Sequence, residues 1–310
     1  MNTQSHAEPD SPLESHVITP PVISETRRMY WSLRRELWER RSIYMAPLSA
    51  AALFLVGFLI SLVQLPAKMR ASMALDPMQQ HEFIQKPYTF AALLILATAF
   101  IVQIFYCLDA LHGERRDRSI LFWKSLPVSD LTTVLAKATI PLVVLPLLSF
   151  ALTVATQWIM VLLSSAVLLA SGQGAAAQWA ELPLFQMSMM LLYHLVAMHV
   201  LWYAPIYCWL LLVSAWARRA AFLWATVPLL VIGVVEKIAF NTSYFVAMLG
   251  YRFGGGLEGA PFTAGNFSMD PMLQLTPGKF LSSGGLWIGL AFAAVFLAAA
   301  VRLRRSQGPI

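Results

Sequence analysis

Residues 111–137 read LHGERRDRSILFWKSLPVSDLTTVLAK, the only long charged segment that lies between two strongly apolar runs, residues 88–110 and 139–170. The whole chain is 58% hydrophobic and 12% charged, with a mean hydropathy of +0.64. Soluble domains do not have this composition, which predicts a multi-span membrane protein. A charged island in such a chain lies outside the hydrocarbon, where a soluble partner can reach it.

Six apolar runs predict an all-α fold with six transmembrane helices, at residues 43–65, 88–110, 139–170, 184–216, 221–240 and 280–301. Each reaches the roughly 20 residues that a helix needs to cross about 30 Å of hydrocarbon. The third and fourth runs are longer than that, so we expect them to tilt, protrude or break. Pro141, Pro146 and Pro205 are the natural places for kinks. The six spans form one domain, residues 43–305.

The N-terminal region divides into two parts. Residues 1–25 are polar, contain four prolines and lack an apolar core segment, which predicts a disordered cytoplasmic tail without a cleavable signal peptide. Residues 26–42 have an apolar residue every four positions (Met29, Leu33 and Leu37), interrupted by Arg34 and Arg41. This pattern predicts an amphipathic helix on the membrane surface, because long arginine side chains reach the headgroups. A solvated charged helix is the alternative.

The basic residues are distributed unequally between the two sides of the predicted membrane domain. With a cytoplasmic N-terminus, the inner side carries sixteen: Arg27, Arg28, Arg34, Arg35, Arg40, Arg41, Arg115, Arg116, Arg118, Lys124, Lys137, Arg218, Arg219, Arg302, Arg304 and Arg305. The outer loops carry five: Lys68, Arg70, Lys86, Arg252 and Lys279. This bias predicts that both termini are cytoplasmic. The formal charge of +6 thus follows from topology, and we expect no nucleic-acid partner.

The charged island, residues 111–137, also contains apolar and aromatic residues. Residues 114–125 can form one short helix that ends before Pro127, and Ser129 can cap the next helix, with Asp130 in its first turn. Arginine beside aromatic residues is typical of protein interfaces. The candidate docking residues are Glu114, Arg115, Arg116, Arg118, Phe122, Trp123, Lys124 and Pro127. A plain interfacial loop explains the composition equally well.

Several residues of the island resemble the signature of type-2 ABC transporter permeases. They are Glu114-Arg115-Arg116-Asp117-Arg118-Ser119, Leu121, Ser125-Leu126-Pro127-Val128-Ser129 and Lys137. Arg35-Glu36-Leu37-Trp38 ahead of the first span and the six-span layout also resemble this family. The chain departs from the family in having Ser119-Ile120 where many members have Gly-Thr, which leaves the subfamily open.

The resemblance implies that residues 111–137 are the coupling segment that rests on an ATP-binding subunit. The chain has no GxxxxGK[ST] phosphate loop, so ATP and Mg²⁺ belong on that separate subunit, and we expect no cofactor in this chain. The resemblance further implies an exporter built from two permease copies, expected to form a homodimer, with two ATP-binding subunits. Its place is the bacterial cytoplasmic membrane, in contact with membrane lipids.

Four residues inside the apolar runs are candidates for a substrate path: Glu236, Lys237, His194 and His199. Charges within a span usually mark a pathway or a pair. The fifth span can instead end near Val235, which would leave Glu236 and Lys237 at the outer interface, followed by a re-entrant helix as the resemblance implies.

A sulfur-rich stripe lies in the fourth span. Met187, Met190, His194 and Met198 fall within about 80° of one helical face, and thioether and imidazole ligands suit Cu(I). Methionine also packs irregular helix contacts well, so we predict no metal site.

Two other classes of function remain as alternatives to a permease. An intramembrane enzyme would use Asp109 and His112 as an acid/base pair, but neither an HExxH nor a GxSxG motif occurs. A scaffold or sensor subunit without transport is the other alternative.

Overall fold

The computed structural model describes residues 24–72, 76–125, 128–254 and 277–306. Within these ranges 89% of the residues are helical and none lies in a strand, which confirms the predicted all-α class. The same ranges contain six helices long and apolar enough to cross a membrane: Ser42–Leu62, Pro77–Arg116, Asp130–Ala170, Gln178–Trp202, Ala221–Phe240 and Gly284–Ser306. The chain is therefore a multi-pass membrane protein by helix length and composition. The predicted tail, residues 1–25, lies almost entirely outside the described residues.

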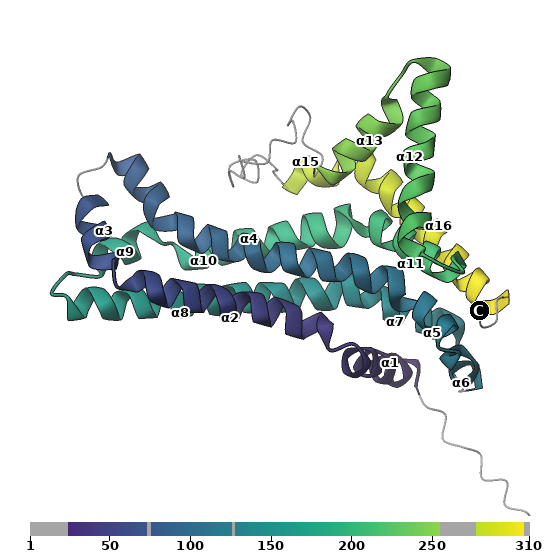
Figure 1. The fold of residues 1–310 in the computed structure, drawn as a ribbon, viewed down its shortest axis with the longest axis horizontal. Coiled ribbons are helices and arrows are strands. Elements are labelled where there is room, and N and C mark those ends of the chain that lie inside the picture. The colour runs from purple at the N-terminus through teal and green to yellow at the C-terminus, as the bar shows by residue number, and fades with distance from the viewer. Residues whose placement is uncertain (1–23, 73–75, 126–127, 255–276, 307–310) are drawn as a thin grey trace, which may run out of the picture.

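The helices follow one another along the chain, and Figure 1 shows their arrangement. They are α1 (Glu25–Glu39), α2 (Ser42–Leu62), α3 (Leu65–Ser72), α4 (Pro77–Ala110), α5 (His112–Arg116), α6 (Ser119–Ser125), α7 (Asp130–Thr139), the π-helix η1 (Ile140–Val144), α8 (Leu145–Ala170), α9 (Ala176–Glu181), α10 (Leu184–His194), the π-helix η2 (Leu195–Trp202), α11 (Ala204–Trp216), α12 (Ala221–Phe240), α13 (Tyr244–Phe253), α15 (Pro277–Leu281) and α16 (Gly284–Ser306).

Long helices lie side by side in one bundle. The helices α2, α4 and α8 pack against one another, with α10 against α8 and α11 against α4 (Figure 1). Fully buried Ile43, Cys107, Leu145 and Tyr207 form part of the core where α2, α4, α8 and α11 meet. This packing of apolar faces fixes the positions of the helix ends that carry the charged residues.

The second and third spans are longer at their N-terminal ends than the apolar runs predicted. Helix α4 begins at Pro77 rather than Tyr88, because Pro77 occupies the first helical turn, where its missing N–H is not needed. The third span begins at Asp130 rather than Thr139, because α7, η1 and α8 are continuous. The π-helix η1 contains Pro141, whose carbonyl accepts a hydrogen bond of 3.0 Å from the Gln103 side chain. A π-helix accommodates this proline without ending the span.

The fourth apolar run, predicted as one span at residues 184–216, is interrupted. Its first part is the candidate span Gln178–Trp202, and its second part is the shorter helix α11. The interruption is at Tyr203, two residues before Pro205, which agrees with the predicted break near that proline. One long predicted span is therefore two helical segments, the first of which ends in the π-helix η2.

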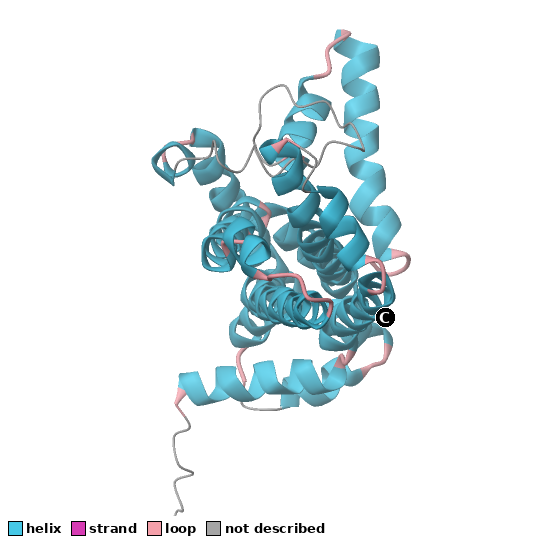
Figure 2. Cartoon of the chain, turned by 90° about the vertical axis from the view of Figure 1, so that its left-hand side faces the viewer, coloured by secondary structure: helices cyan, strands magenta, loops and turns pink. Residues whose placement is uncertain are grey.

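Two helices lie across the direction of the bundle. Figures 1 and 2 show α1 running crosswise at one end of α2, and α12 leaving the bundle at a steep angle. Helix α1 ends at Glu39 and not at residue 42, and its Leu33 and Leu37 pack on the core while Trp38 is 74% exposed. The amphipathic pattern therefore does form a helix with one buried side and one exposed side.

Helix α13 returns from the far end of α12 and is attached to the bundle. Trp202 Nε1 donates to the carbonyl of Arg252 at 2.8 Å, and the Tyr203 hydroxyl donates to that of Phe253 at 3.1 Å. The guanidinium of Arg252 lies over the Trp202 ring and against Gly289 of α16, where a Cβ atom would collide with it. Burial lowers the pKa of Arg252.

Candidate functional site: a buried ionic cluster at the α5–α6 turn

The charged island forms α5, α6 and most of α7. The prediction of one helix over residues 114–125 is wrong. The chain breaks at Asp117–Arg118, where Arg118 has the left-handed φ of 58°. This conformation is uncommon for a residue other than glycine, which is why the helical pattern did not indicate it. The predicted cap of α7 is confirmed, because Ser129 Oγ accepts a hydrogen bond from the Thr132 N–H at 3.1 Å. Residues 126–127, which include the candidate Pro127, lie outside the described residues.

Glu114 and Arg115, both predicted docking residues, are buried at the base of this turn. Arg115 Nη1 donates to the carbonyl of Ala215 at 2.6 Å and to that of Ala217 at 3.3 Å, at the end of α11. The adjacent Ser214 hydroxyl accepts hydrogen bonds from the backbone N–H groups of residues 111 and 112. These contacts fix α5 to the bundle.

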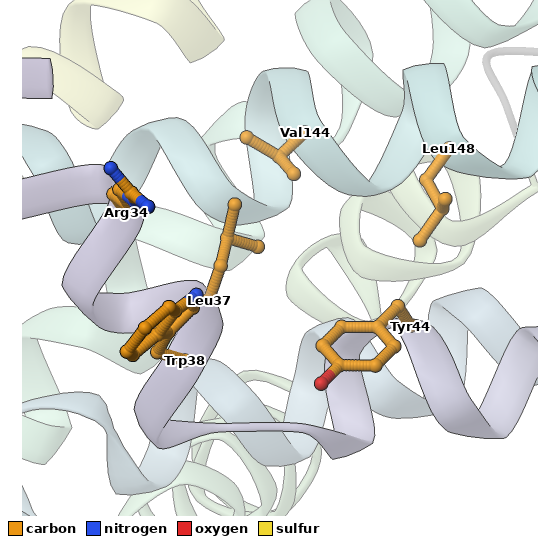
Figure 3. Close-up of a pocket in the computed structure, with 6 residues that line it drawn as sticks. All are labelled: Arg34, Leu37, Trp38, Tyr44, Val144 and Leu148. Carbon is orange, nitrogen blue, oxygen red and sulfur yellow. The ribbon is translucent and has the colours of Figure 1, made fainter.

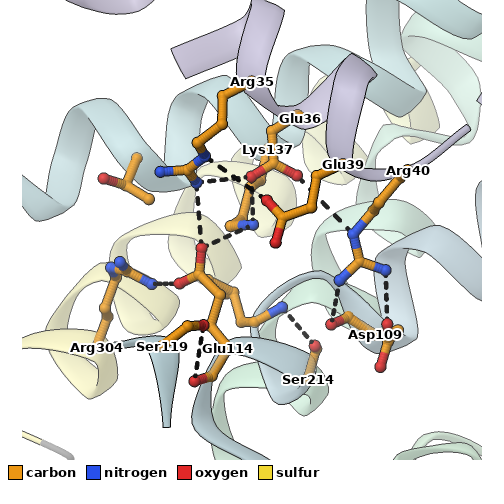
Figure 4. Close-up of polar contacts among 12 residues, drawn as sticks. Arg35, Glu36, Glu39, Arg40, Asp109, Glu114, Ser119, Lys137, Ser214 and Arg304 are labelled. Atoms are coloured by element: carbon orange, nitrogen blue, oxygen red, sulfur yellow. Dashed lines mark hydrogen bonds and ion pairs between the residues drawn. The ribbon is translucent and has the colours of Figure 1, made fainter. Parts of the chain in front are cut away.

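Glu114 belongs to a cluster of six charged side chains that we call the ionic cluster. Figure 4 labels all of them except Asp130. Its members are the acidic residues Glu36, Glu114 and Asp130 and the basic residues Arg35, Lys137 and Arg304. They come from α1, α5, α7 and α16, whose positions in the sequence are far apart. Packing of the bundle brings them together at one end.

Lys137 lies between the two glutamates of the ionic cluster. Its Nζ atom is 2.6 Å from Glu36 Oε1 and 3.1 Å from Glu114 Oε1. Glu114 also pairs with Arg304, and Arg304 Nε is 3.1 Å from Asp130 Oδ1. The side chains of Lys137, Glu36, Glu114 and Arg304 are all at most 5% exposed. Buried charges are tolerated only when paired in this way.

Arg35 completes the cluster on the α1 side. Its Nη2 atom is 2.9 Å from Glu36 Oε1 and 3.3 Å from Glu114 Oε1. Glu36 also accepts a hydrogen bond of 3.0 Å from the Tyr106 hydroxyl. Burial would raise the pKa of Glu36, but Lys137 and Arg35 outweigh it and lower the pKa to about 2. Glu36 is therefore ionised at neutral pH.

A second ion pair, beside the cluster, joins the C-terminal end of α1 to the end of α4. Arg40 Nη1 is 2.6 Å from Asp109 Oδ2, and Arg40 Nη2 donates to the Asp109 carbonyl at 3.1 Å. His112 is not part of this ion pair, and its Nδ1 atom lies 3.1 Å from the Ala217 carbonyl oxygen. The contacts of Asp109 and His112 thus position helices, and the two do not contact each other in the described structure.

The outer surface of the turn carries the other predicted docking residues. Arg116, Arg118, Phe122 and Lys124 are exposed, with Phe122 and Arg116 each 60% exposed. Trp123 is half-buried beneath the Arg35 guanidinium, whose carbon lies 3.8 Å from the ring centroid. The turn therefore has an exposed basic and aromatic surface directly over the ionic cluster.

The candidate substrate-path residues have separate local roles. Glu236 accepts hydrogen bonds from the backbone N–H groups of Tyr244 at 2.7 Å and Phe245 at 2.8 Å, and so caps α13. Lys237 is exposed and, among the described residues, has no ion pair with Glu236. Capping of α13 explains why a carboxylate lies at the end of α12, so a role in a substrate path is not needed to explain it.

His194 and His199 lie in an aromatic cluster elsewhere in the bundle. Their ring centroids are 5.9 Å apart, and His199 contacts Phe100 and Tyr203 at 6.1 and 5.6 Å. The described contacts do not connect them to Glu236.

The two end residues of the sulfur-rich stripe, Met187 and Met198, lie in different parts of the core. Met187 packs on the core between α2, α4 and α8, whereas Met198 is buried against Phe280 and Leu286. The π-helix that begins at Leu195 changes the angular spacing on which the predicted stripe depended. Among the described residues, no group of three or more His, Cys, Asp or Glu side chains is arranged to hold a metal ion.

Comparison of the chain with protein-family models, curated proteins and solved structures finds no match.

Proposed function

We propose that this chain is the membrane subunit of an ATP-driven ABC exporter in the bacterial cytoplasmic membrane. In this proposal two copies form a homodimer around the substrate path, and two ATP-binding subunits dock on the α5–α6 turn. ATP and Mg²⁺ bind to those subunits, and this chain supplies the path and the mechanical coupling. The signature residues of the charged island and the six candidate spans support the proposal.

The observation that carries the proposal is the position of the ionic cluster beneath the exposed α5–α6 surface. Glu114 lies on α5 and pairs with Lys137 on α7 and Arg304 on α16, while Lys137 also pairs with Glu36 on α1. A partner that displaces the turn would therefore displace the ends of these helices together. Helices α1 and α7 lead directly into the spans α2 and α8, and α16 is itself a candidate span.

The arrangement of the ends supports docking from the cytoplasm. Figure 1 places α1, α5, α6 and the C-terminal end of α16 at the same end of the bundle. This end carries most of the sixteen basic residues that the positive-inside rule assigns to the cytoplasm. If this end of the bundle is cytoplasmic, α1 lies along the inner membrane surface. Its exposed Tyr30, Trp31 and Trp38 then lie among the lipid headgroups.

Docking is tested by co-expressing the chain with an ABC ATP-binding subunit and purifying the two together. The double substitution Arg116→Glu with Phe122→Ala changes two exposed residues of the turn, so the fold should persist while assembly and ATPase stimulation are lost. The matched control is Arg70→Glu with Phe83→Ala, which makes the same chemical changes at exposed positions near the other end of the bundle. Normal assembly of the first variant, or equal loss in both variants, would refute docking at α5–α6.

A further inference from the structure

A pocket lies inside the bend between α1 and α2. Its volume is about 410 Å³, and it is lined by Arg34, Leu37, Trp38, Tyr44, Val144 and Leu148. Figure 3 shows Arg34, Leu37 and Trp38 on α1 on one side of the space, Tyr44 on α2 below, and Val144 and Leu148 on the opposite wall. The volume is in the usual range for sites that bind small molecules.

The single charged residue of this pocket is Arg34, which is held without a carboxylate partner. Its guanidinium carbon lies 5.3 Å from the Trp31 ring centroid and 5.5 Å from that of Trp38. Nearby Arg35 and Arg40 pair with acidic residues, but no described residue places a carboxylate within ion-pair distance of Arg34. The two indoles therefore position a cation whose donors remain available to a ligand.

The remaining walls are aliphatic or aromatic. Leu37 and Leu148 are half-buried, and Tyr44 is 37% exposed at the start of α2, where the apolar span begins. A ligand that matches both the Arg34 guanidinium and these apolar walls has an anionic head and an apolar tail. A guanidinium binds the oxygens of a phosphate with two parallel hydrogen bonds, and basic pockets between spans are suited to anionic lipid headgroups.

We propose that the pocket binds an anionic phospholipid, with the phosphate on Arg34 and part of an acyl chain against Leu37, Val144 and Leu148. The lipid would lie between α1 and the η1–α8 junction and would hold α1 against the bundle. Arg35, next in sequence to Arg34, belongs to the ionic cluster, so the lipid would also stabilise that cluster. This proposal does not depend on an ATPase partner.

The proposal is tested on the purified full-length chain in a neutral detergent, with dioleoyl phosphatidylglycerol and dioleoyl phosphatidylcholine as probes. Native mass spectrometry should detect a retained phosphatidylglycerol, and Arg34→Gln should weaken its retention about tenfold through loss of the charged hydrogen bonds. The matched control Arg41→Gln removes an exposed charge that does not line the pocket, so retention should change less than about twofold.

Two further measurements separate the lipid from other ligands. Glycerol 3-phosphate at the same concentration should not bind, because it lacks the apolar tail. Leu148→Trp fills the apolar wall and keeps Arg34, so it should also reduce phosphatidylglycerol retention. Equal retention by the Arg34→Gln and Arg41→Gln variants, equal binding of phosphatidylcholine, binding of glycerol 3-phosphate alone, or unchanged retention by Leu148→Trp would each overturn the proposal.

Discussion

The two ends of the bundle are held together by different chemistry. At the α5 end, the ionic cluster buries Glu36, Glu114, Lys137 and Arg304. At the other end, the buried contacts are between neutral groups: the Gln178 amide donates to the Tyr88 hydroxyl at 2.9 Å and to Ser164 Oγ. His81 Nδ1 and Glu181 Oε2 also lie 2.6 Å apart at this end, but these side chains are 48% and 36% exposed. We call Gln178, Tyr88 and Ser164 the amide network.

This difference shows that joining helix ends in this bundle does not require buried charge. Neutral hydrogen bonds from the short helix α9 fasten α4 to α8. Buried ion pairs gain little net stability, because their desolvation offsets most of their attraction. The charges therefore suit a function in which the four helices move as a unit, as in the proposed coupling, better than a purely structural function.

The largest expected effect on stability is that of Lys137→Met, which leaves Glu36 and Glu114 without their shared cation. Removal of one partner of a buried ion pair costs about 3–5 kcal/mol. Thermal unfolding in detergent should show a large loss of stability, and adding Glu36→Gln should restore part of it. Lys237→Met removes an exposed cation as the control. Equal midpoints for Lys137→Met and the control would contradict the structural role of the cluster.

The second expected effect is that the stability contributed by the ionic cluster at the α5 end depends on pH. Burial alone would raise the pKa of Glu36, but Lys137 and Arg35 lower it from 4.5 to about 2. Its ionised form thus contributes stability above pH 4.5, and that contribution is lost as the pH falls through about 2. The difference in unfolding midpoint between wild type and Glu36→Gln should narrow from neutral pH to about pH 3.

A control variant and one contradicting outcome define the test of this pH dependence. A Gln178→Ala variant should keep a constant difference from wild type over the same range, because the substitution removes no titratable group. If the Glu36→Gln difference is also constant, Glu36 is not held ionised by the cluster.

The smallest expected effect belongs to the amide network. Gln178→Ala removes both hydrogen bonds of the amide, but the Tyr88 hydroxyl and Ser164 Oγ remain 3.3 Å apart and can bond to each other. We expect a loss of about 1 kcal/mol in the free energy of unfolding. Denaturant titration followed by tryptophan fluorescence measures it, with the exposed Gln79→Ala as the control. A loss as large as that of Lys137→Met would remove the distinction between the two ends.

Features that depend on local sequence were predicted well. Apolar length indicated the candidate spans, Ser129 indicated the start of α7, and Pro205 indicated the interruption of the fourth run. Each depends on a residue and its near neighbours. The left-handed Arg118 was missed, because glycine or asparagine usually marks such a position.

The ionic cluster was not predicted as a site. Glu114 was interpreted as a docking residue, and Arg304 contributed only to the count of basic residues. Lys137 entered through that count and the resemblance, and Glu36 only through the resemblance. Tertiary packing selects the partners of a buried charge, and the period of one helix does not contain that information. The available signal was the presence of charged residues at the ends of apolar helices that share one side of the membrane.

The attachment of α13 has a mechanical consequence. Trp202 and Tyr203, which hold the last carbonyls of α13, are the residues at the interruption between η2 and α11. Trp209 on α11 likewise donates to the carbonyl of Ala225 near the start of α12. The α12–α13 arm is thus a brace fastened on both sides of this joint. Bending at Tyr203 would change the distance between these two attachments, so the turn between α12 and α13 would have to open or close with it.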